Sequence, residues 1–328
     1  MKKNVAVITG GEASEVGIAL KSAQVAFKYI DRNLFDVYLV VIEKNDWWYV
    51  ADEKKVAKMD KNDFSLLLPD TKVYFDAVFI AIHGTPAEDG KLQGYFDMLK
   101  IPYNCCGVLQ AALTFDKSRT KEYLAQLGIK TATSVVGFKA ESTTDFEKEI
   151  KDKVPFPVFV KPNKNGSSYG ASKVNTEAEL KAALDNAFEF DDEVIVEEFL
   201  KGREVTNGVF TLDGKTVPLP ITEILTQNEF FDYKAKYEGA SQEITPADLD
   251  ENTTKAIQQS SVAIYEKLGF KGMCRVDYII TARGFYMLEV NAIPGMSKES
   301  LIPQQAIAAG FDLTFFFTNS VVACLSGR

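Results

Sequence analysis

The sequence CRVDYIITARGFYMLEVNAIPGMS, residues 274–297, predicts two antiparallel strands joined by a tight turn. We expect the strands over 274–280 and 285–290, because both runs are short and rich in β-branched and aromatic residues. The tetrapeptide 281–284 predicts the turn, since Gly284 can adopt the positive φ that a tight hairpin requires. The hairpin carries an unusual set of polar side chains, namely Arg275, Asp277, Glu289 and Asn291.

We expect these polar side chains on one face of the hairpin, because side chains two residues apart in a strand point to the same side. A three-residue loop, 282–284, would place Asp277 opposite Glu289, with their Cβ atoms about 5 Å apart. The same register places Arg275 opposite Asn291. Facing carboxylates repel unless a cation or a shared proton lies between them. The pattern therefore indicates either a Mg²⁺ site built from hard oxygen ligands or a solvated face of Arg–Asp and Arg–Glu ion pairs.

The composition is that of a globular protein with two or three domains. The chain has 328 residues, of which 46% are hydrophobic and 25% are charged, and its net charge is −9. This charge argues against nucleic acid or an anionic membrane as a partner. The four cysteines form no C-x-x-C motif, which fits a reducing compartment. We find no signal peptide and no apolar run long enough to span a membrane, so we expect no membrane span.

The first third of the chain alternates between strand and helix patterns. Strands are predicted over 3–11, 36–42 and 76–84, and helices over 16–30 and 89–100. This alternation is typical of a small, doubly wound α/β domain.

The rest of the chain predicts two α+β lobes. The fold class is therefore α/β plus α+β, with an N-terminal α/β domain over 1–118 and a two-lobed unit over 119–328. We expect the lobes over about 119–203 and 204–328, with clefts between them. The segment 44–72 is polar and rich in lysine; within it DWWYV predicts an edge strand, and we assign the segment no function.

Two loops and one histidine are candidates for chemistry. The loop Gly166-Ser167-Ser168, with Lys161 upstream, suits a phosphate, although an ordinary hairpin loop has the same composition. The aromatic segment 228–247 predicts a lid, the alternative being a disordered connector. His83 is the single histidine and follows a strand; we expect it to orient other groups rather than to transfer protons.

Seven motifs, read together, resemble the D-alanine–D-alanine ligases of the ATP-grasp superfamily. The resemblance runs in the right order from Val5 to about Gly310. The motifs are HGTPAEDGKLQG, FDKSRTK, FPVFVKPNKNGSSYGASKV, VIVEEFLKGRE, FFDYKAKY, RVDYI and LEVNAIPGMSKESLIP. The resemblance identifies the two-lobed unit as an ATP-grasp unit, with ATP between its lobes.

The resemblance also implies roles for residues that match the motifs. Residues that match magnesium ligands are Asp277, Glu289 and Asn291, and two Mg²⁺ ions are expected, which Mn²⁺ can replace. Residues that match nucleotide-binding groups are Lys117, Lys161 and Lys236 at the phosphates, and Glu197, Glu198, Leu200 and Glu204 at adenine and ribose. Residues that match catalytic groups are Glu15, Ser167 and Tyr237 around the first D-alanine, and Arg275 at the oxyanion. Residues that match other substrate-binding groups are His83, Gly295, Ser300 and Leu301.

The activity implied is the ATP-dependent ligation of two D-alanines for peptidoglycan precursor synthesis. In this family the reaction passes through an acyl phosphate and a tetrahedral intermediate and releases ADP and phosphate. A homodimer in the cytoplasm is implied as well. Two alternatives stay open: a ligase that makes D-Ala–D-lactate or D-Ala–D-serine, and a non-catalytic ATP-grasp regulator. Tyr237 favours D-alanine as the acceptor, since the resemblance implies that the lids of the variant ligases lack it.

Overall fold

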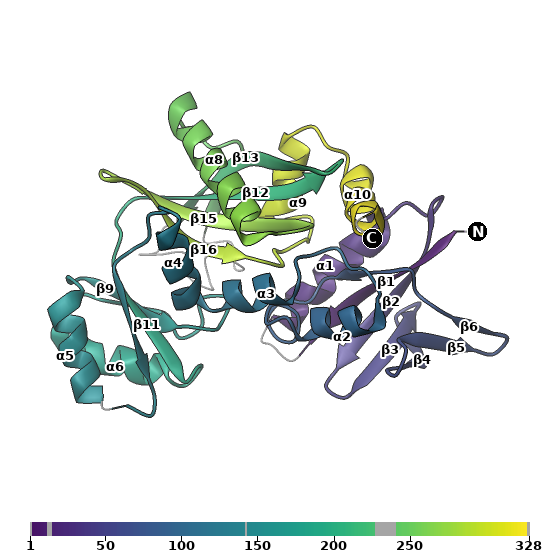
Figure 1. Ribbon diagram of the computed structural model, residues 1–328, viewed down its shortest axis with the longest axis horizontal. Helices are drawn as coiled ribbons and strands as arrows, with labels where there is room; N and C mark the ends of the chain where they lie inside the picture. The colour runs from purple at the N-terminus through teal and green to yellow at the C-terminus, as the bar shows by residue number, and fades with distance from the viewer. Residues whose placement is uncertain (1, 12–14, 142, 227–240, 327–328) are drawn as a thin grey trace.

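The computed structural model describes residues 2–11, 15–141, 143–226 and 241–326. The described strands form three sheets of seven, four and five strands. Each sheet belongs to a different lobe, and Figure 1 shows the N-terminal lobe on the right, the four-stranded lobe on the left and the five-stranded lobe above. The α/β plus α+β fold class is confirmed, while the boundaries near residues 118 and 203 stay predictions.

The first sheet has the order β6-β5-β4-β3-β2-β1-β7. Its strands are β1 (Lys3–Gly10), β2 (Phe35–Glu43), β3 (Asp46–Ala51), β4 (Lys54–Asp60), β5 (Ser65–Leu68), β6 (Thr71–Val73) and β7 (Ala77–Ile80). Strand β1 pairs in parallel with β2 and β7, whereas β3 to β6 extend the sheet in antiparallel pairs.

Helices cover both faces of the parallel part of this sheet. The helices are α1 (Val16–Tyr29), α2 (Lys91–Leu99), α3 (Val108–Phe115) and α10 (Leu313–Ser326). Val5 and Val7 of β1 are buried in one core with α1 and α10, and Ala6 and Ile8 are buried in another core with α2 and α3. This alternation along one strand confirms the doubly wound prediction.

The prediction that DWWYV is an edge strand is wrong. Strand β3 lies between β2 and β4, and the edge strands of the sheet are β6 and β7. The reason is an aromatic cluster that the polar composition of the segment concealed: Trp47 lies 5.9 Å from Phe64 and 5.2 Å from Tyr95 of α2, measured between ring centroids. Packing of these rings against α2 holds the antiparallel extension on the domain.

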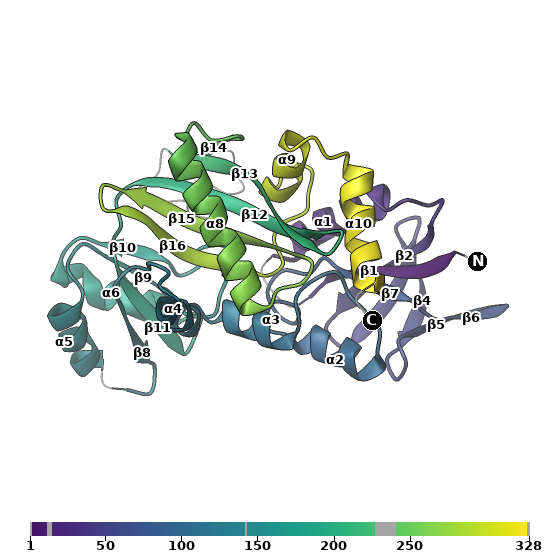
Figure 2. The same ribbon diagram turned by 45° about the horizontal axis from the view of Figure 1, so that its top comes forward.

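The four-stranded sheet has the order β10-β9-β11-β8. Its elements are β8 (Ser134–Phe138), α5 (Thr143–Lys153), β9 (Val158–Pro162), β10 (Ser172–Val174), α6 (Glu177–Ala187) and β11 (Glu193–Glu198). Helices α5 and α6 share one apolar core with this sheet, which includes Ile150 and Leu184. The N-terminal lobe is connected to this lobe through α3 and α4 (Lys117–Gln126), which run between them in Figure 2.

The five-stranded sheet has the order β14-β13-β12-β15-β16. Its elements are β12 (Arg203–Leu212), β13 (Lys215–Thr226), β14 (Ser241–Ile244), α8 (Glu251–Leu268), β15 (Met273–Thr281), β16 (Gly284–Asn291) and α9 (Leu301–Ala308). Although α10 follows these elements in the chain, it packs on the N-terminal sheet, as Figure 1 shows. No single helix in the described ranges could span a membrane, although α9 and α10, bent by 109°, meet the length and composition test as a pair.

The hairpin has the predicted register but a different turn. Arg275 pairs with Asn291, and Asp277 pairs with Glu289. The turn is shorter than predicted, because Thr281 pairs with Gly284 and leaves a two-residue loop. A register shift after Asp277 compensates for the shorter loop and restores the pairing of the polar residues.

Candidate active site

One cavity of about 510 Å³ brings together every predicted site residue that the structure describes. These residues come from all three lobes and are Glu15, His83, Lys117, Lys161, Ser167, Glu197, Glu198, Leu200, Glu204, Arg275, Asp277, Glu289, Asn291, Gly295, Ser300 and Leu301. The other two predicted residues, Lys236 and Tyr237, lie outside the described residues. A site predicted from separate motifs is therefore a single continuous surface.

The hairpin forms one wall of this cavity, and the side chains of three residues donate hydrogen bonds to Asp277. Arg275 donates from Nε and Nη2 to the two Asp277 oxygens, at 2.8 Å each. Thr206 donates to Asp277 at 2.6 Å, and the Asn291 amide donates to it at 2.9 Å. The Arg–Asp pair that we considered as an alternative is thus present, but it lines the cavity instead of a solvated face.

The oxygen atoms on this wall fit a divalent cation. Asp277 and Glu289 face each other across the two strands, and Asn291 adds an amide oxygen on the same side. Carboxylate and amide oxygens are the ligands that Mg²⁺ takes in proteins. The described residues contain no cluster of three or more His, Cys, Asp or Glu that could hold a metal. The expected set of magnesium ligands has only two carboxylates and therefore depends on the amide of Asn291.

The opposite wall carries Lys117, Lys161 and the buried carboxylate of Glu197. We call it the lysine wall. Glu197 is 3% exposed, and its two oxygens accept from Lys161, at 2.9 Å, and from Lys121. Sequence reasoning missed Lys121, which is buried and contacts Glu197 from α4. The signal was present in FDKSRTK, because residues 117 and 121 are one helical turn apart and share a face.

The charges on this wall shift one another's pKa values. Burial acts to raise the pKa of Glu197, but the ammonium groups of Lys121 and Lys161 outweigh it and lower that pKa to about 2. Burial acts to lower the pKa of Lys161, but Glu197 and Glu289 raise it overall. For Lys117 burial prevails, and its pKa is lowered. The charges of Lys121, Lys161 and Glu197 therefore compensate one another, whereas the charge of Lys117 is poorly compensated.

The glycine loop brings Glu15 of the N-terminal lobe against Ser167. The Ser167 hydroxyl donates to Glu15 Oε1, and Ser167 and Ser168 adopt positive φ angles of 50° and 57°. Gly166 allows this approach, because a Cβ there would lie 2.7 Å from Glu15 Oε2. The predicted neighbours Glu15 and Ser167 are thus brought together.

His83 links two lobes and has no acid–base partner among the described residues. Its Nδ1 lies 3.0 Å from the Ile293 carbonyl, which can only accept, so Nδ1 carries the proton. Its Nε2 then accepts from the Ser22 hydroxyl at 3.2 Å, and Ser22 in turn accepts from the Met296 N–H at 3.1 Å. Burial lowers the pKa of His83. These contacts are those of a neutral histidine, and its role in orienting other groups stays a prediction.

Glu88 is a second residue that sequence reasoning missed, after Lys121. It lines the cavity and lies in the quoted motif HGTPAEDG, whose acidic pair was the available signal. Burial raises the pKa of Glu88 to about 8, and the nearby charge of Glu15 adds to the shift. At neutral pH this carboxyl group is therefore largely protonated in the structure as it stands.

The segment 198–200 has the backbone groups that an adenine edge needs. The N–H groups of Glu198 and Phe199 are used by the carbonyls of Thr133 and Pro157, at 2.9 Å each. Within the described part of the chain, no group accepts from the N–H of Leu200. The Glu198 side chain turns to Thr133 and accepts from its N–H at 3.2 Å. The backbone, rather than this side chain, is available to a base.

Residues 295–301 close the cavity on the side of α9. Ser300 is the N-cap residue of α9, and its hydroxyl lies 2.9 Å from that of Ser297. Gly295 gives it room, since a Cβ at Gly295 would lie 2.8 Å from the Ser300 oxygen. The N-terminal end of a helix and two hydroxyl groups suit a carboxylate.

Comparison with known proteins gives matches over nearly the whole chain. Residues 4–106 match the family model "D-ala D-ala ligase N-terminus", and residues 124–321 match "D-ala D-ala ligase C-terminus". A D-alanine–D-alanine ligase of Flavobacterium johnsoniae is 46% identical and covers 99% of this chain and 100% of its own length.

Two solved structures are similar over the same span. The VanG D-Ala:D-Ser ligase from Enterococcus faecalis has a TM-score of 0.88 at 32% identity, with 98% of this chain and 99% of that chain covered. A D-alanine–D-alanine ligase from Bacillus anthracis complexed with ATP has a TM-score of 0.76 at 27% identity, with 99% and 97% covered.

Residues of the four-stranded and the five-stranded sheets line one cavity. Together with this arrangement, the likenesses define the class of protein: the fold is that of the ATP-grasp ligases. Within that class, the two family models and the identity over the full length show the narrower group. The chain belongs to the D-alanine–D-alanine ligase family.

Proposed function

We propose that this protein joins two D-alanines into D-alanyl-D-alanine with ATP, for peptidoglycan precursor synthesis. One observation carries the proposal: the groups needed for phosphates, for an ammonium, for an oxyanion and for a carboxylate line one cavity. The family membership supports the same activity.

The lysine wall would hold the nucleotide. Lys117 and Lys161 supply positive charge for the phosphates, and the N–H of Leu200, from which no described group accepts, supplies a donor to adenine. Positioning and charge stabilisation account for most of the catalysis of phosphoryl transfer. In the first step the carboxylate of one D-alanine attacks the γ-phosphate, the bond to ADP breaks, and an acyl phosphate forms. Glu15 would hold the ammonium of this D-alanine.

The hairpin wall would serve the second step. The amine of the second D-alanine attacks the acyl carbon, phosphate leaves, and the amine loses a proton. Arg275 is held by its two hydrogen bonds to Asp277, so it is a preoriented donor for the oxyanion of the tetrahedral intermediate. Ser300 and the backbone of Gly295, at the start of α9, would hold the carboxylate of the second D-alanine.

Asp277, Glu289 and Asn291 would hold Mg²⁺, which supplies positive charge against the phosphates. We propose two ions, with Mn²⁺ as a substitute. We also propose that the protein acts in the cytoplasm, where ATP is available, and that it forms a homodimer.

A second candidate is the ligation of D-alanine to D-serine. It is favoured by the likeness to the D-Ala:D-Ser ligase of E. faecalis. The two candidates share the nucleotide site and the first amino acid site, so they differ only in the acceptor.

The test is phosphate release from ATP and Mg²⁺ with D-alanine, with L-alanine or with no amino acid. Release that depends on D-alanine is expected, and Asp277→Asn should abolish most of it, because the substitution removes a carboxylate from the cation site and from Arg275. ATP binding without D-alanine-dependent release would refute the ligase and favour a nucleotide-binding regulator.

A further inference from the structure

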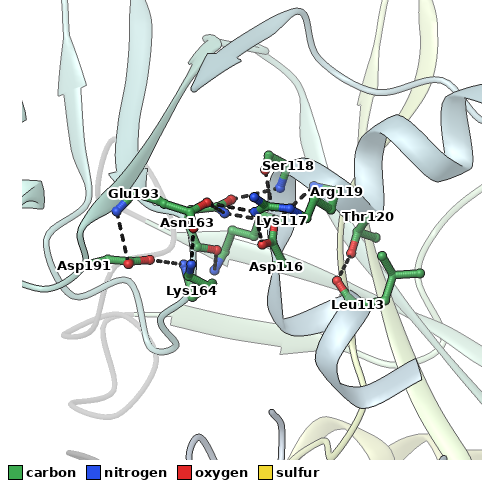
Figure 3. A network of polar contacts seen from close by, with 10 residues as sticks. All are labelled: Leu113, Asp116, Lys117, Ser118, Arg119, Thr120, Asn163, Lys164, Asp191 and Glu193. Carbon is green, nitrogen blue, oxygen red and sulfur yellow. Dashed lines mark hydrogen bonds and ion pairs between the residues drawn. The ribbon is translucent and has the colours of Figure 1, made fainter. Parts of the chain in front are cut away.

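Asn163 connects three parts of the lysine wall without lining the cavity itself. It directly follows β9, which carries Lys161, and it precedes the glycine loop. Its side chain points toward the start of α4, which carries Lys117, as Figure 3 shows. Asn163 is fully buried. Lys161 and Lys117 are the groups that the proposed function assigns to the phosphates, and the sequence of the glycine loop predicts a phosphate site as well.

The amide of Asn163 satisfies polar groups on the two elements beside it. Its Oδ1 accepts from the Ser118 N–H at 2.9 Å. Its Nδ2 donates to Asp116 at 2.9 Å and to Glu193 at 3.1 Å. Arg119 bridges the same two carboxylates. Burial acts to raise the pKa of Asp116, but the hydrogen bonds that it accepts outweigh burial and lower that pKa.

The first turn of α4 is therefore capped from two sides. The Arg119 N–H donates to Asp116, the N-cap residue, at 3.1 Å. The N–H of Lys117 donates to the Asn163 carbonyl at 3.3 Å, and the N–H of Ser118 donates to the Asn163 side chain. The N–H groups that a helix start normally offers to an anion are thus occupied. Positive charge for a phosphate must come from the lysine side chains instead.

Lys117 returns to the same loop through its side chain. Its Nζ donates to the Asn165 carbonyl at 2.6 Å. The loop and Lys117 are thus joined twice, once through the Asn163 amide at the helix start and once through the ammonium group. The first connection fixes the backbone from which Lys117 extends.

We propose that Asn163 is a positioning residue for the nucleotide phosphates: its buried amide fixes the start of α4 to the glycine loop, and so sets where Lys117 meets a phosphate. The inference rests on the proposed function, since it assumes that a nucleotide binds at the lysine wall. Asn163 itself touches no substrate.

The experiment is a double-mutant cycle in the full chain. ATP affinity is measured by calorimetry with Mg²⁺ for the parent, Asn163→Ala, Lys117→Met and the double variant. We expect Asn163→Ala to weaken ATP binding about tenfold in the parent. In the Lys117→Met background the same substitution should have an effect within about twofold, because the residue it positions is gone. The inhibition constant of adenosine, which has no phosphate, should stay within about twofold of the parent value.

The matched control is Asp250→Ala, which removes an N-cap from α8 at a distance from the cavity. The substitution should lower thermal stability and leave the affinities for ATP and for adenosine unchanged. If Asn163→Ala does not fold, Asn163→Ser replaces it in the cycle. An equal loss of ATP affinity in both backgrounds, or an equal loss for ATP and adenosine, would show a structural role only and overturn the inference. If the parent binds no ATP, the proposed function itself fails.

Discussion

Two carboxyl groups of the same cavity, Glu197 and Glu88, have opposite electrostatic environments. Burial acts to raise the pKa of both. Glu197 contacts the ammonium groups of Lys121 and Lys161, and its pKa falls to about 2. Glu88 has another acid, Glu15, as its strongest charged neighbour, and its pKa rises to about 8. The partners of a buried carboxyl group, rather than burial alone, decide its charge.

The largest effect should come from removing a partner of Glu197. Lys121→Met leaves a buried carboxylate with one ammonium group, and we expect a loss of about 3 kcal/mol in the free energy of unfolding, measured in urea. The matched control is Lys181→Met, which breaks an exposed pair with Asp185 and should cost less than about 1 kcal/mol. Equal losses for the two variants would show that the Lys121–Glu197 pair is not buried as described.

A double substitution sharpens the same comparison. Adding Glu197→Gln to Lys121→Met removes the uncompensated charge, so the double variant should recover part of the stability that the single variant loses. Denaturation midpoints of the four proteins of the cycle provide the measurement. A double variant that is less stable than Lys121→Met would contradict the assignment of the loss to a buried charge.

The pH dependence of stability should carry the signature of Glu197 on the acid side. Its folded pKa, about 2, lies below the unfolded value of 4.5. The unfolded state therefore binds more protons in that interval, so the contribution of Glu197 is present above pH 4.5 and is lost as the pH falls toward 2. Glu197→Gln should make the melting temperature less sensitive to pH in this window. An unchanged slope would refute the lowered pKa.

Glu88 should have the opposite sign. Its folded pKa, about 8, lies above the unfolded value of 4.5, so the folded state binds more protons between these values and stability falls as the pH rises through them. Glu88→Gln should remove this decline in the ligand-free protein, as measured by thermal melts. Glu299→Gln, at an exposed acidic residue of the same cavity, is the control and should retain the decline of the parent.

The smallest effect concerns a buried polar group without charge. Ser22→Ala removes the donor to His83 and the acceptor of the Met296 N–H, which should cost about 1 kcal/mol of stability. Ser326→Ala, at an exposed serine, serves as the control. A loss above about 3 kcal/mol would indicate that His83 is charged rather than neutral.

The sequence predicted the elements that local patterns define. The apolar run of β1 and the helical spacing of α1 reflect burial, whereas the register of the hairpin was derived from a three-residue loop that the structure does not have. The two-residue turn was missed because the compensating shift after Asp277 lies in the strand pairing rather than in any local signal. The aromatic packing of β3 on α2 was missed for a related reason, since Trp47 and Tyr95 are distant in the chain.

The site was predicted mainly from motifs, and what escaped prediction depends on tertiary contacts. The motif FDKSRTK gave Lys117, but the role of Lys121 depends on the position of Glu197 in β11, which is distant in the chain. Asn163 likewise follows a recognised motif residue, yet its function as a cap for α4 requires the two elements to lie side by side. Long-range partners of this kind leave no periodic signal in one sequence.

The most direct test of the account is the mass of the product that forms from ATP, Mg²⁺ and D-alanine when equal amounts of D-serine and D-lactate are present at neutral pH. The account predicts D-alanyl-D-alanine as the main product. A main product that contains D-serine or D-lactate would contradict D-alanine as the acceptor, and the absence of any ligation product would contradict the central claim that this cavity joins two amino acids.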